Sequence, residues 1–313
     1  MLEDLGIEIV THTLPFRLNH VNCFVAEGED GYVVIDAGLH NKETVTRWDE
    51  ALDGKNVTDI LITHYHPDHL GYAGALQEKH QARLHMSKRD ANNILSAWED
   101  GFLNNLLNKY TEAGIPTAVG RAMVENTKEF LPLVTPFPKI NHYYEEYEKI
   151  KIGREIYEVI FTPGHSDGLV TFYNKDKGVL ISTDHILPRI TPNISYWFYG
   201  DLNPLQTYIE SLHKVRKLDA EYVIPSHGKP FYHANKRIDE ILAHHEERLE
   251  TTIEILKKHH TVYEICKELF NFELTIHETR FAIGETIAHL EYLHQKGEVV
   301  REYIEGKRHY RLT

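Results

Sequence analysis

The chain has 313 residues, of which 42% are hydrophobic and 26% are charged; this balance is typical of a globular protein and excludes a disordered chain. The formal net charge of −13 disfavours nucleic acid as a partner, because binding along a phosphate backbone depends on Lys and Arg, although a local basic groove stays open. The length suits one large domain and one small one.

The sequence shows no targeting or membrane-spanning signal. Residues Met1–Gly6 lack a basic segment leading into an apolar one, and nowhere do about eighteen apolar residues follow one another. Cys23 and Cys266 are far apart, so we expect buried thiols and no disulfide framework. These observations favour a soluble, cytoplasmic protein without a membrane partner.

The first part of the chain is predicted to alternate strands with a helix. Apolar segments between turn residues indicate strands at Ile7–Thr13, Val21–Ala26, Tyr32–Ile35 and Ile60–Thr63. Before the last of these, Lys42–Leu52 has apolar residues at helical spacing. The strand–helix–strand order predicts a layered architecture of α and β elements.

A histidine-rich turn follows the Ile60–Thr63 strand. Its candidate metal ligands are His64, His66, Asp68 and His69. His64 and His66 alternate as strand-end residues do, so both side chains can point to the same side. Imidazole and carboxylate are ligands that zinc, manganese and iron share. A merely solvated His-rich loop is disfavoured, because low-complexity His tracts rarely follow a strand and open into a helix.

Asp36 ends the Tyr32–Ile35 strand in a similar way. We expect its carboxylate near the histidine-rich turn, where it could orient a ligating histidine. The alternative is that Asp36-Ala37-Gly38 is only a turn.

Helical patterns dominate the chain after this turn as far as about residue 131. A helix is expected at Leu70–His80, a strand at Ala82–Met86 and a helical insertion from Lys88 onwards. Most apolar residues of the insertion should lie in a core. Some of its aromatic residues could instead form a wall over the metal site: Trp98, Phe102 and Tyr110.

Three later strands also lead to a histidine or an aspartate. Ile156–Phe161 precedes His165, Val179–Ser182 precedes Asp184, and the strand from Tyr222 precedes His227. An ordinary hydrophobic core does not require a potential ligand after each of its strands, so the recurrence indicates one shared metal site.

The sequence His64-Tyr65-His66-Pro67-Asp68-His69 resembles the His-x-His-x-Asp-His signature of the metallo-β-lactamase superfamily, and the later His and Asp positions follow in the same order. The resemblance extends over roughly residues 7–235. It implies an α+β fold, a four-layer αββα sandwich of two sheets between helices. It also implies a hydrolase with two zinc ions per chain, with iron or manganese as alternatives.

The resemblance assigns each candidate ligand a role. The first metal would be held by His64, His66 and His165. The second would be held by Asp68, His69 and His227, and Asp184 would bridge the two. A hydroxide shared by the metals would be the nucleophile, and Asp68 would also act as a catalytic residue that relays a proton. His185 is expected to pack behind the site rather than to bind metal.

An aromatic, proline-containing loop follows Asp184 and could serve as a lid or a substrate platform, with Tyr196 or Tyr199 offering a hydroxyl. Packing alone would also explain these aromatic residues.

The tail is expected to form a second domain, residues 236–313, after a catalytic domain of residues 1–235. A long amphipathic helix at Lys236–Lys258, two shorter helices and a final hairpin are predicted. Helices followed by a hairpin resemble the winged-helix tail of some relatives in this superfamily. Acidic helices disfavour DNA binding by the tail, so we expect it to pack, to form a homodimer or to line the pocket. His244-His245 and His259-His260 are expected on the surface.

Taken together, these features predict a hydrolase of a small ester-type substrate, such as a thioester, a lactone or another ester. The first alternative is a metal-dependent phosphodiesterase or endoribonuclease. The second is an iron-dependent sulfur oxygenase, because the ligand types do not fix the metal.

Overall fold

The computed structural model describes residues 1–98 and 100–313, which form two compact units. Unit 1 consists of Met1–Asn92, Phe130–Pro192 and Ser211–Ile238. Unit 2 consists of Asn93–Glu129, Asn193–Glu210 and Asp239–Thr313. The units are interleaved along the chain, and unit 2 takes segments from both sides of the boundary expected after residue 235, which stays a prediction.

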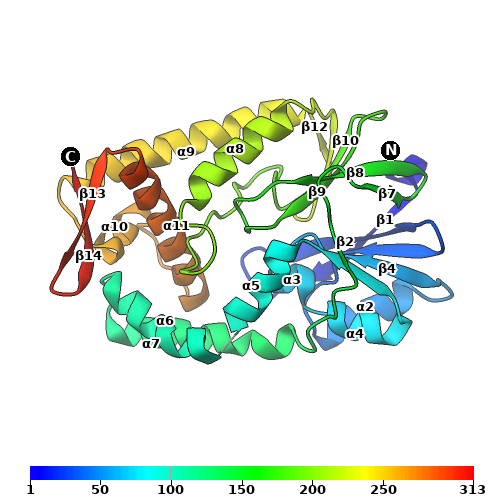
Figure 1. The fold of residues 1–313 in the computed structure, drawn as a ribbon, viewed down its shortest axis with the longest axis horizontal. Coiled ribbons are helices and arrows are strands. Elements are labelled where there is room, and N and C mark those ends of the chain that lie inside the picture. Colours follow the sequence, from blue (N-terminus) through cyan, green and yellow to red (C-terminus); the bar gives the residue numbers. More distant parts are fainter. Residues whose placement is uncertain (99) are drawn as a thin grey trace. The chain divides into compact units, whose positions relative to one another are not determined.

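Unit 1 contains two six-stranded sheets (Figure 1). The first has the strand order β1 (Ile7–Thr13), β2 (His20–Glu27), β3 (Tyr32–Ile35), β4 (Val57–Leu61), β5 (Arg83–Met86) and β6 (His142–Tyr143). The second has the order β12 (Phe231–Tyr232), β11 (Tyr222–Pro225), β10 (Val179–Thr183), β9 (Val170–Asn174), β8 (Glu155–Phe161) and β7 (Lys149–Ile152). Strands β3 to β6 are parallel, as are β10 and β11, so the sheets are mixed.

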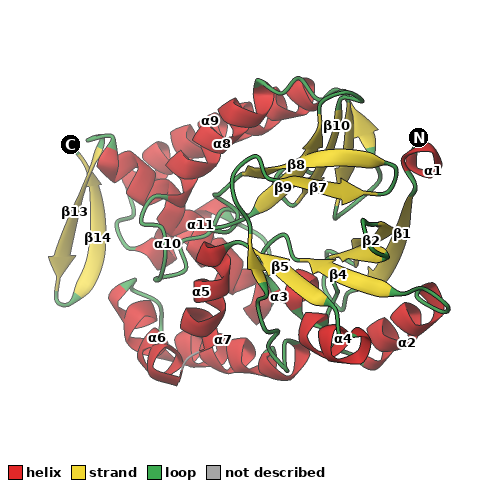
Figure 2. Cartoon of the chain, turned by 45° about the vertical axis from the view of Figure 1, so that its right-hand side comes forward, coloured by secondary structure: helices red, strands yellow, loops and turns green. Residues whose placement is uncertain are grey.

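The two sheets share one hydrophobic core. Phe24, Ile35 and Leu61 of the first sheet are buried in the same cluster as Phe172 and Ile181 of the second. Helices α2 (Lys42–Ala51) and α4 (Ala73–His80) lie along the first sheet (Figure 2). All residues of β9 and β10 are buried, as expected for strands covered on both faces. The predicted mixed α+β fold with two sheets and flanking helices is therefore confirmed.

Strand β4 ends at Leu61, two residues earlier than predicted. The amide of Thr63 donates to the Asp36 carboxylate over 2.9 Å, so this side chain takes the place of a ladder partner. His64 therefore lies in a loop, and His66 is the N-cap of the short helix α3 (Pro67–Leu70). The interpretation of His64 and His66 as alternating strand residues is wrong.

Unit 2 is mainly helical. Its elements include α6 (Asp100–Glu112), α7 (Thr117–Glu129), α10 (Val262–Leu269), α11 (Ile276–Gln295) and the hairpin β13 (Val299–Ile304) and β14 (Lys307–Leu312). Capping boxes at Thr261 and Thr275 begin α10 and α11. The predicted hairpin is present, whereas the winged-helix resemblance stays a prediction.

The remaining helices are α1 (Leu2–Leu5), α5 (Lys88–Trp98), α8 (Pro204–Arg216) and the long α9 (Ala234–Leu256), together with the 3-10 turn Leu131–Leu133.

His245 of α9 is 2% exposed, so its predicted surface position is wrong. It follows Ile241 by one helical turn on the buried stripe of α9, and its Nδ1 lies 3.2 Å from Nε2 of His289. Among the described helices, none has the length and apolar character needed to cross a membrane.

Candidate metal centre

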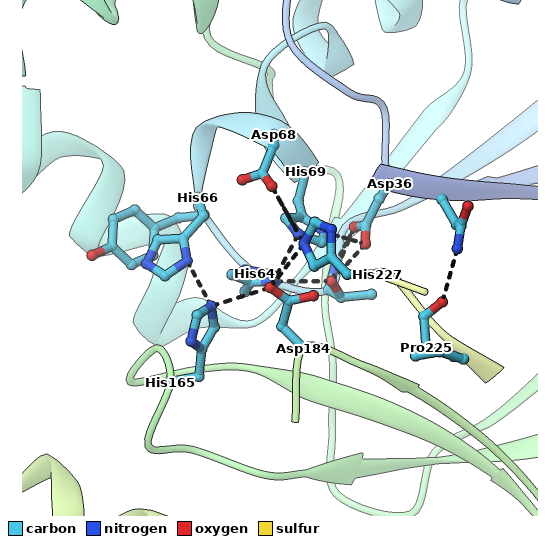
Figure 3. A network of polar contacts seen from close by, with 12 residues as sticks. Asp36, His64, His66, Asp68, His69, His165, Asp184, Pro225 and His227 are labelled. Carbon is cyan, nitrogen blue, oxygen red and sulfur yellow. Dashed lines mark hydrogen bonds and ion pairs between the residues drawn. The ribbon is translucent and has the colours of Figure 1, made fainter. Parts of the chain in front are cut away.

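All seven predicted ligand residues lie in unit 1, on loops or helix starts that follow strands (Figure 3). The β4 strand leads to His64, His66, Asp68 and His69. The strands β8, β10 and β11 lead to His165, Asp184 and His227 respectively. Three groups of these residues have ligand atoms within 4.8 Å of one another: His64, His66 and His165; His64, His69 and Asp184; Asp68, His69 and His227.

Asp184 lies at the centre of these groups. Its Oδ2 atom is 3.3 Å from Nε2 of His227, 3.5 Å from Nε2 of His69 and 3.4 Å from Nε2 of His165. On the other side, Nδ1 of His66 lies 2.9 Å from Nε2 of His165. One carboxylate thus faces histidines from both predicted metal positions.

The ring orientation of His69 and His64 is fixed by neighbours outside the cluster. Nδ1 of His69 donates to Oδ2 of Asp36 over 2.8 Å, as expected for a carboxylate that orients a ligand. The Thr63 hydroxyl donates to the same carboxylate, so at 3.1 Å it accepts from Nδ1 of His64. In both imidazoles Nδ1 is thus the nitrogen that donates outward, and Nε2 is left facing the site.

Strand β2 fixes the third ring in the same way. Nδ1 of His227 donates to the His20 carbonyl over 2.6 Å, while the next amide, Gly228, donates to Nε2 of His20. Asn22 donates to the Gly228 carbonyl over 2.8 Å. The roles of His20 and Asn22 were not predicted, because no local pattern in the sequence shows that β2 lies beside the loop after β11.

These orientations leave polar atoms without partners. Within the described residues, Nε2 of His64, His69 and His227 and Oδ1 of Asp184 are buried and make no hydrogen bond. Buried polar groups are normally satisfied, so such a set indicates a ligand that the atoms are arranged to hold. Neutral imidazoles and carboxylates are the donors that bind a divalent cation, and the residues therefore fit a metal.

Electrostatics support the same conclusion. Burial alone would raise the pKa of Asp184, but the facing His227 and His69 hold it well below its usual range. Burial, with neighbouring histidines adding to it, lowers the pKa of His64 far below its ordinary value. Burial also opposes the charge on His69, yet Asp184 and Asp68 raise its pKa well above the ordinary value. A metal would compete there with a proton.

Two other predicted features are His185 and the aromatic loop that follows Asp184. His185 is fully buried, is not part of any of the three ligand groups, and burial lowers its pKa to about 3. The aromatic loop packs inside unit 2, where Tyr196 contacts Phe198 and Phe198 contacts Tyr110. Its role as a lid or platform stays a prediction.

Comparisons with known proteins agree with the geometry. A family model described as "Metallo-beta-lactamase superfamily" matches residues 17–227, and one described as "Metallo-beta-lactamase-like, C-terminal domain" matches residues 249–311. The chain is 26% identical to the probable metallo-hydrolase YqjP of Bacillus subtilis, covering 96% of this chain and 95% of that protein. It is 25% identical to the hydroxyacylglutathione hydrolase GloC of Haemophilus influenzae, over 58% of this chain and 71% of that protein.

A crystal structure gives the same result. The beta-lactamase domain protein of Burkholderia ambifaria matches with a TM-score of 0.87 and 31% identity, over 98% of this chain and 92% of that one. The chain therefore belongs to the metallo-beta-lactamase superfamily and is a metallo-hydrolase of that family.

Proposed function

We propose that this metallo-hydrolase binds two divalent metal ions, preferably zinc, and hydrolyses a small ester-type substrate: a thioester, a lactone or another ester. The observation that carries the proposal is the position of Asp184. Its Oδ2 lies 3.3 to 3.5 Å from Nε2 of His165, which is proposed to hold the first metal, and of His69 and His227, which are proposed to hold the second. A buried carboxylate that faces histidines of both sets could be shared by two cations.

The first metal is assigned to His64, His66 and His165. The second is assigned to Asp68, His69 and His227. When bound, a pair of cations supplies Lewis acidity, which lowers the pKa of water and polarises a carbonyl or phosphoryl oxygen. The protein contributes a rigid donor set, because Asp36, Thr63 and His20 hold the rings in the orientation that presents Nε2.

Asp68 is the candidate for proton transfer. Its side chain is 19% exposed, whereas those of His69 and His227 are almost completely buried. Its Oδ2 lies 3.5 Å from Nε2 of His227, so it belongs to the site and also reaches solvent. A carboxylate in this position can accept a proton and pass it to a leaving group.

Two observations support an ester-type substrate. The chain is acidic overall, with a net charge of −13, which disfavours long anionic polymers. GloC, the relative named above, is by its name a hydrolase of hydroxyacylglutathione. A phosphodiesterase or endoribonuclease activity and an iron-dependent oxygenase activity are the alternatives that the experiment must separate.

The test combines metal analysis with a substrate panel. We expect purified protein to contain about two metal ions per chain and to cleave at least one thioester, lactone or ester. Asp184→Asn should lower turnover by more than about 100-fold, the upper end for residues that only support a ligand. Asp176→Asn, in the exposed turn after β9, is the matched control and should behave as wild type.

Other outcomes would contradict the proposal. Cleavage of phosphodiesters alone would replace the substrate class. One iron per chain together with oxygen consumption would replace hydrolysis by oxidation. Full activity of Asp184→Asn would remove the assigned site.

A further inference from the structure

A further buried carboxylate of unit 1, Asp90, is bonded to residues next to the candidate ligands in the sequence. Asp90 is in the first turn of α5 and its side chain is completely buried. Oδ2 accepts hydrogen bonds from the Ser166 hydroxyl over 2.6 Å and from the Tyr65 amide over 3.1 Å. Oδ1 accepts from the Gly168 amide over 2.7 Å.

These partners lie on two different loops. Tyr65 stands between His64 and His66 on the loop after β4, and Ser166 follows His165 on the loop after β8. One carboxylate thus joins the two loops that supply all three residues of the first ligand group. Asp36, by comparison, accepts hydrogen bonds from Thr63 and from His69, which is proposed to hold the second metal.

The local structure is arranged to bring this carboxylate to the loops. The Ser87 hydroxyl, just before α5, accepts from the Asp90 amide over 3.2 Å, as the side chain of an N-cap residue does in a capping box. In a capping box the acidic side chain returns to the cap, but that of Asp90 binds the two loops. A Cβ on Gly168 would lie 2.2 Å from the Ser87 hydroxyl and 2.9 Å from Oδ1 of Asp90, so only glycine allows this close approach.

Burial of a carboxylate is costly unless hydrogen bonds compensate for lost hydration. Burial raises the pKa of Asp90 to about 7, against the opposing effect of the Ser166 hydroxyl. Its three partners are neutral donors, and all three are satisfied only when both oxygens accept. A buried apolar residue in place of Asp90 would leave these three donors without an acceptor, so the position requires a side chain with two acceptor oxygens.

We propose that Asp90 is a positioning residue that holds the His64–His66 loop and the His165 loop together and thereby sets the metal affinity of the first ligand group. The inference rests on the proposed metal-dependent function. It assigns to Asp90 an effect on one of two metals, through loops that carry ligands, and no contact with substrate.

Asp90→Asn is the most informative variant, because it keeps the shape of the side chain. An amide has one oxygen, so its NH2 group must face either the Gly168 amide or the Tyr65 amide, and two donors then meet. Outer-shell partners of metal ligands typically change metal affinity by about 10- to 100-fold, and we expect a loss of this size for one metal only.

Asp59→Asn is the matched control. Asp59 of β4 is also buried and accepts hydrogen bonds over 2.9 Å from Arg83 and 2.7 Å from His85. Neither of these partners is a candidate ligand or lies on a ligand loop. This variant should lose thermal stability and keep both metal affinities.

The measurement is the zinc content of the full chain over a series of free zinc concentrations fixed by a chelator. The absorption spectrum of the cobalt-loaded protein reports the ligand geometry in parallel. We expect one binding step of Asp90→Asn to move to higher zinc and the other to stay in place. His165→Ala alone should weaken the same step that Asp90→Asn moves, whereas His227→Ala alone should weaken the other step, and these two variants identify which metal Asp90 affects.

Ser166→Ala keeps the carboxylate and removes one bond, so it should show a smaller shift of the same step even if Asp90→Asn folds poorly. Unchanged zinc affinity and an unchanged cobalt spectrum in either variant would overturn the inference, and so would equal losses in Asp90→Asn and Asp59→Asn. In those cases the wild-type protein would still bind two metals and the proposed function would stand. A wild-type protein that binds no metal would overturn both.

Discussion

At each of three candidate ligands, the ring nitrogen that faces away from the site is held by a polar group outside the ligand set. His69 uses the Asp36 carboxylate, His64 the Thr63 hydroxyl and His227 a backbone carbonyl of β2. Because a neutral imidazole has one donor and one acceptor nitrogen, each of these bonds selects the tautomer that leaves Nε2 as the acceptor. Metal binding then needs little rearrangement of the rings.

His12 of β1 is a buried histidine outside the metal centre, and its surroundings differ from those of the candidate ligands. It is 2% exposed, packs at 5.0 Å from the Trp48 ring, and within the described residues neither of its nitrogens makes a hydrogen bond. Burial, with the Arg47 charge adding to it, lowers the pKa of His12 to about 4. Its contribution to stability is therefore full above pH 6.5, its ordinary pKa, and is lost as the pH falls toward 4.

We expect His12→Phe to make unfolding less sensitive to acid. Between pH 8 and pH 5, His12 should remove about 2 kcal/mol from the free energy of unfolding of the wild-type protein, and the variant should lack this loss. Urea unfolding at several pH values, in EDTA so that metal release does not contribute, measures the difference. Equal pH slopes for both proteins would refute the role of His12.

At the level of secondary-structure elements, short strands position the loops that carry the candidate ligands. Glycines allow helices and connecting segments to pack closely together. In α4, a Cβ on Gly74 would lie only 1.9 Å from the Pro136 carbonyl, and one on Gly71 would lie 2.5 Å from the Leu133 carbonyl. The connector after Leu131–Leu133 therefore passes directly over the backbone that follows the ligand helix α3. A side chain at either glycine must displace backbone, which cannot turn away as a side chain can.

Gly74→Ala should accordingly destabilise the protein, even though alanine is the better helix former. We expect a loss of about 3 kcal/mol, as for overpacked sites in cores. Gly54→Ala serves as the control, because a Cβ there meets nothing within 4 Å and only its positive φ of 70° opposes the change. Urea unfolding of both variants gives the comparison, and equal losses would show that the contact with Pro136 does not matter.

On the scale of the whole molecule, unit 2 is assembled from three separate segments of chain. Its core joins Leu106 and Met123 of α6 and α7 to Ile283 and Leu290 of α11. A cut after residue 235 would keep α6 and α7 but remove α9, α10 and α11. The apolar residues of α6 and α7 that pack against the removed helices would then be exposed.

A chain of residues 1–235 should therefore aggregate or bind a hydrophobic dye, because contiguous apolar surface becomes exposed. A second truncation, in which residues 94–129 are also replaced by a short Gly-Ser linker, removes that surface and should be more soluble. Size-exclusion chromatography and dye fluorescence compare the two with the full chain. A monomeric, cooperatively unfolding 1–235 fragment would instead support the boundary after residue 235.

Much of the fold and of the candidate site could be predicted because the signals are local. Apolar segments bounded by turns identified strands such as β1 and β3, and a ligand-type residue soon after each of four strands identified the cluster. The parallel pair β10 and β11 brings two of these loops to the same end of the second sheet, whereas β4 belongs to the first sheet. The end of β4 was misplaced because the bond that ends it, from the Thr63 amide to Asp36, joins residues 27 positions apart.

The sequence by itself determined the chemistry of the site, since the ligand types and their order lie in short motifs whose form does not depend on distant residues. The orienting role of Asp36 was expected from its place at the end of a strand, whereas the tertiary structure alone decided that His20 holds the ring of His227 and that Asp90 binds both the Tyr65 amide and the Ser166 hydroxyl. The tertiary structure also decided that the two units interleave along the chain. The physical reason is that hydrogen bonds and packing between distant segments leave no periodic pattern in the residues that make them.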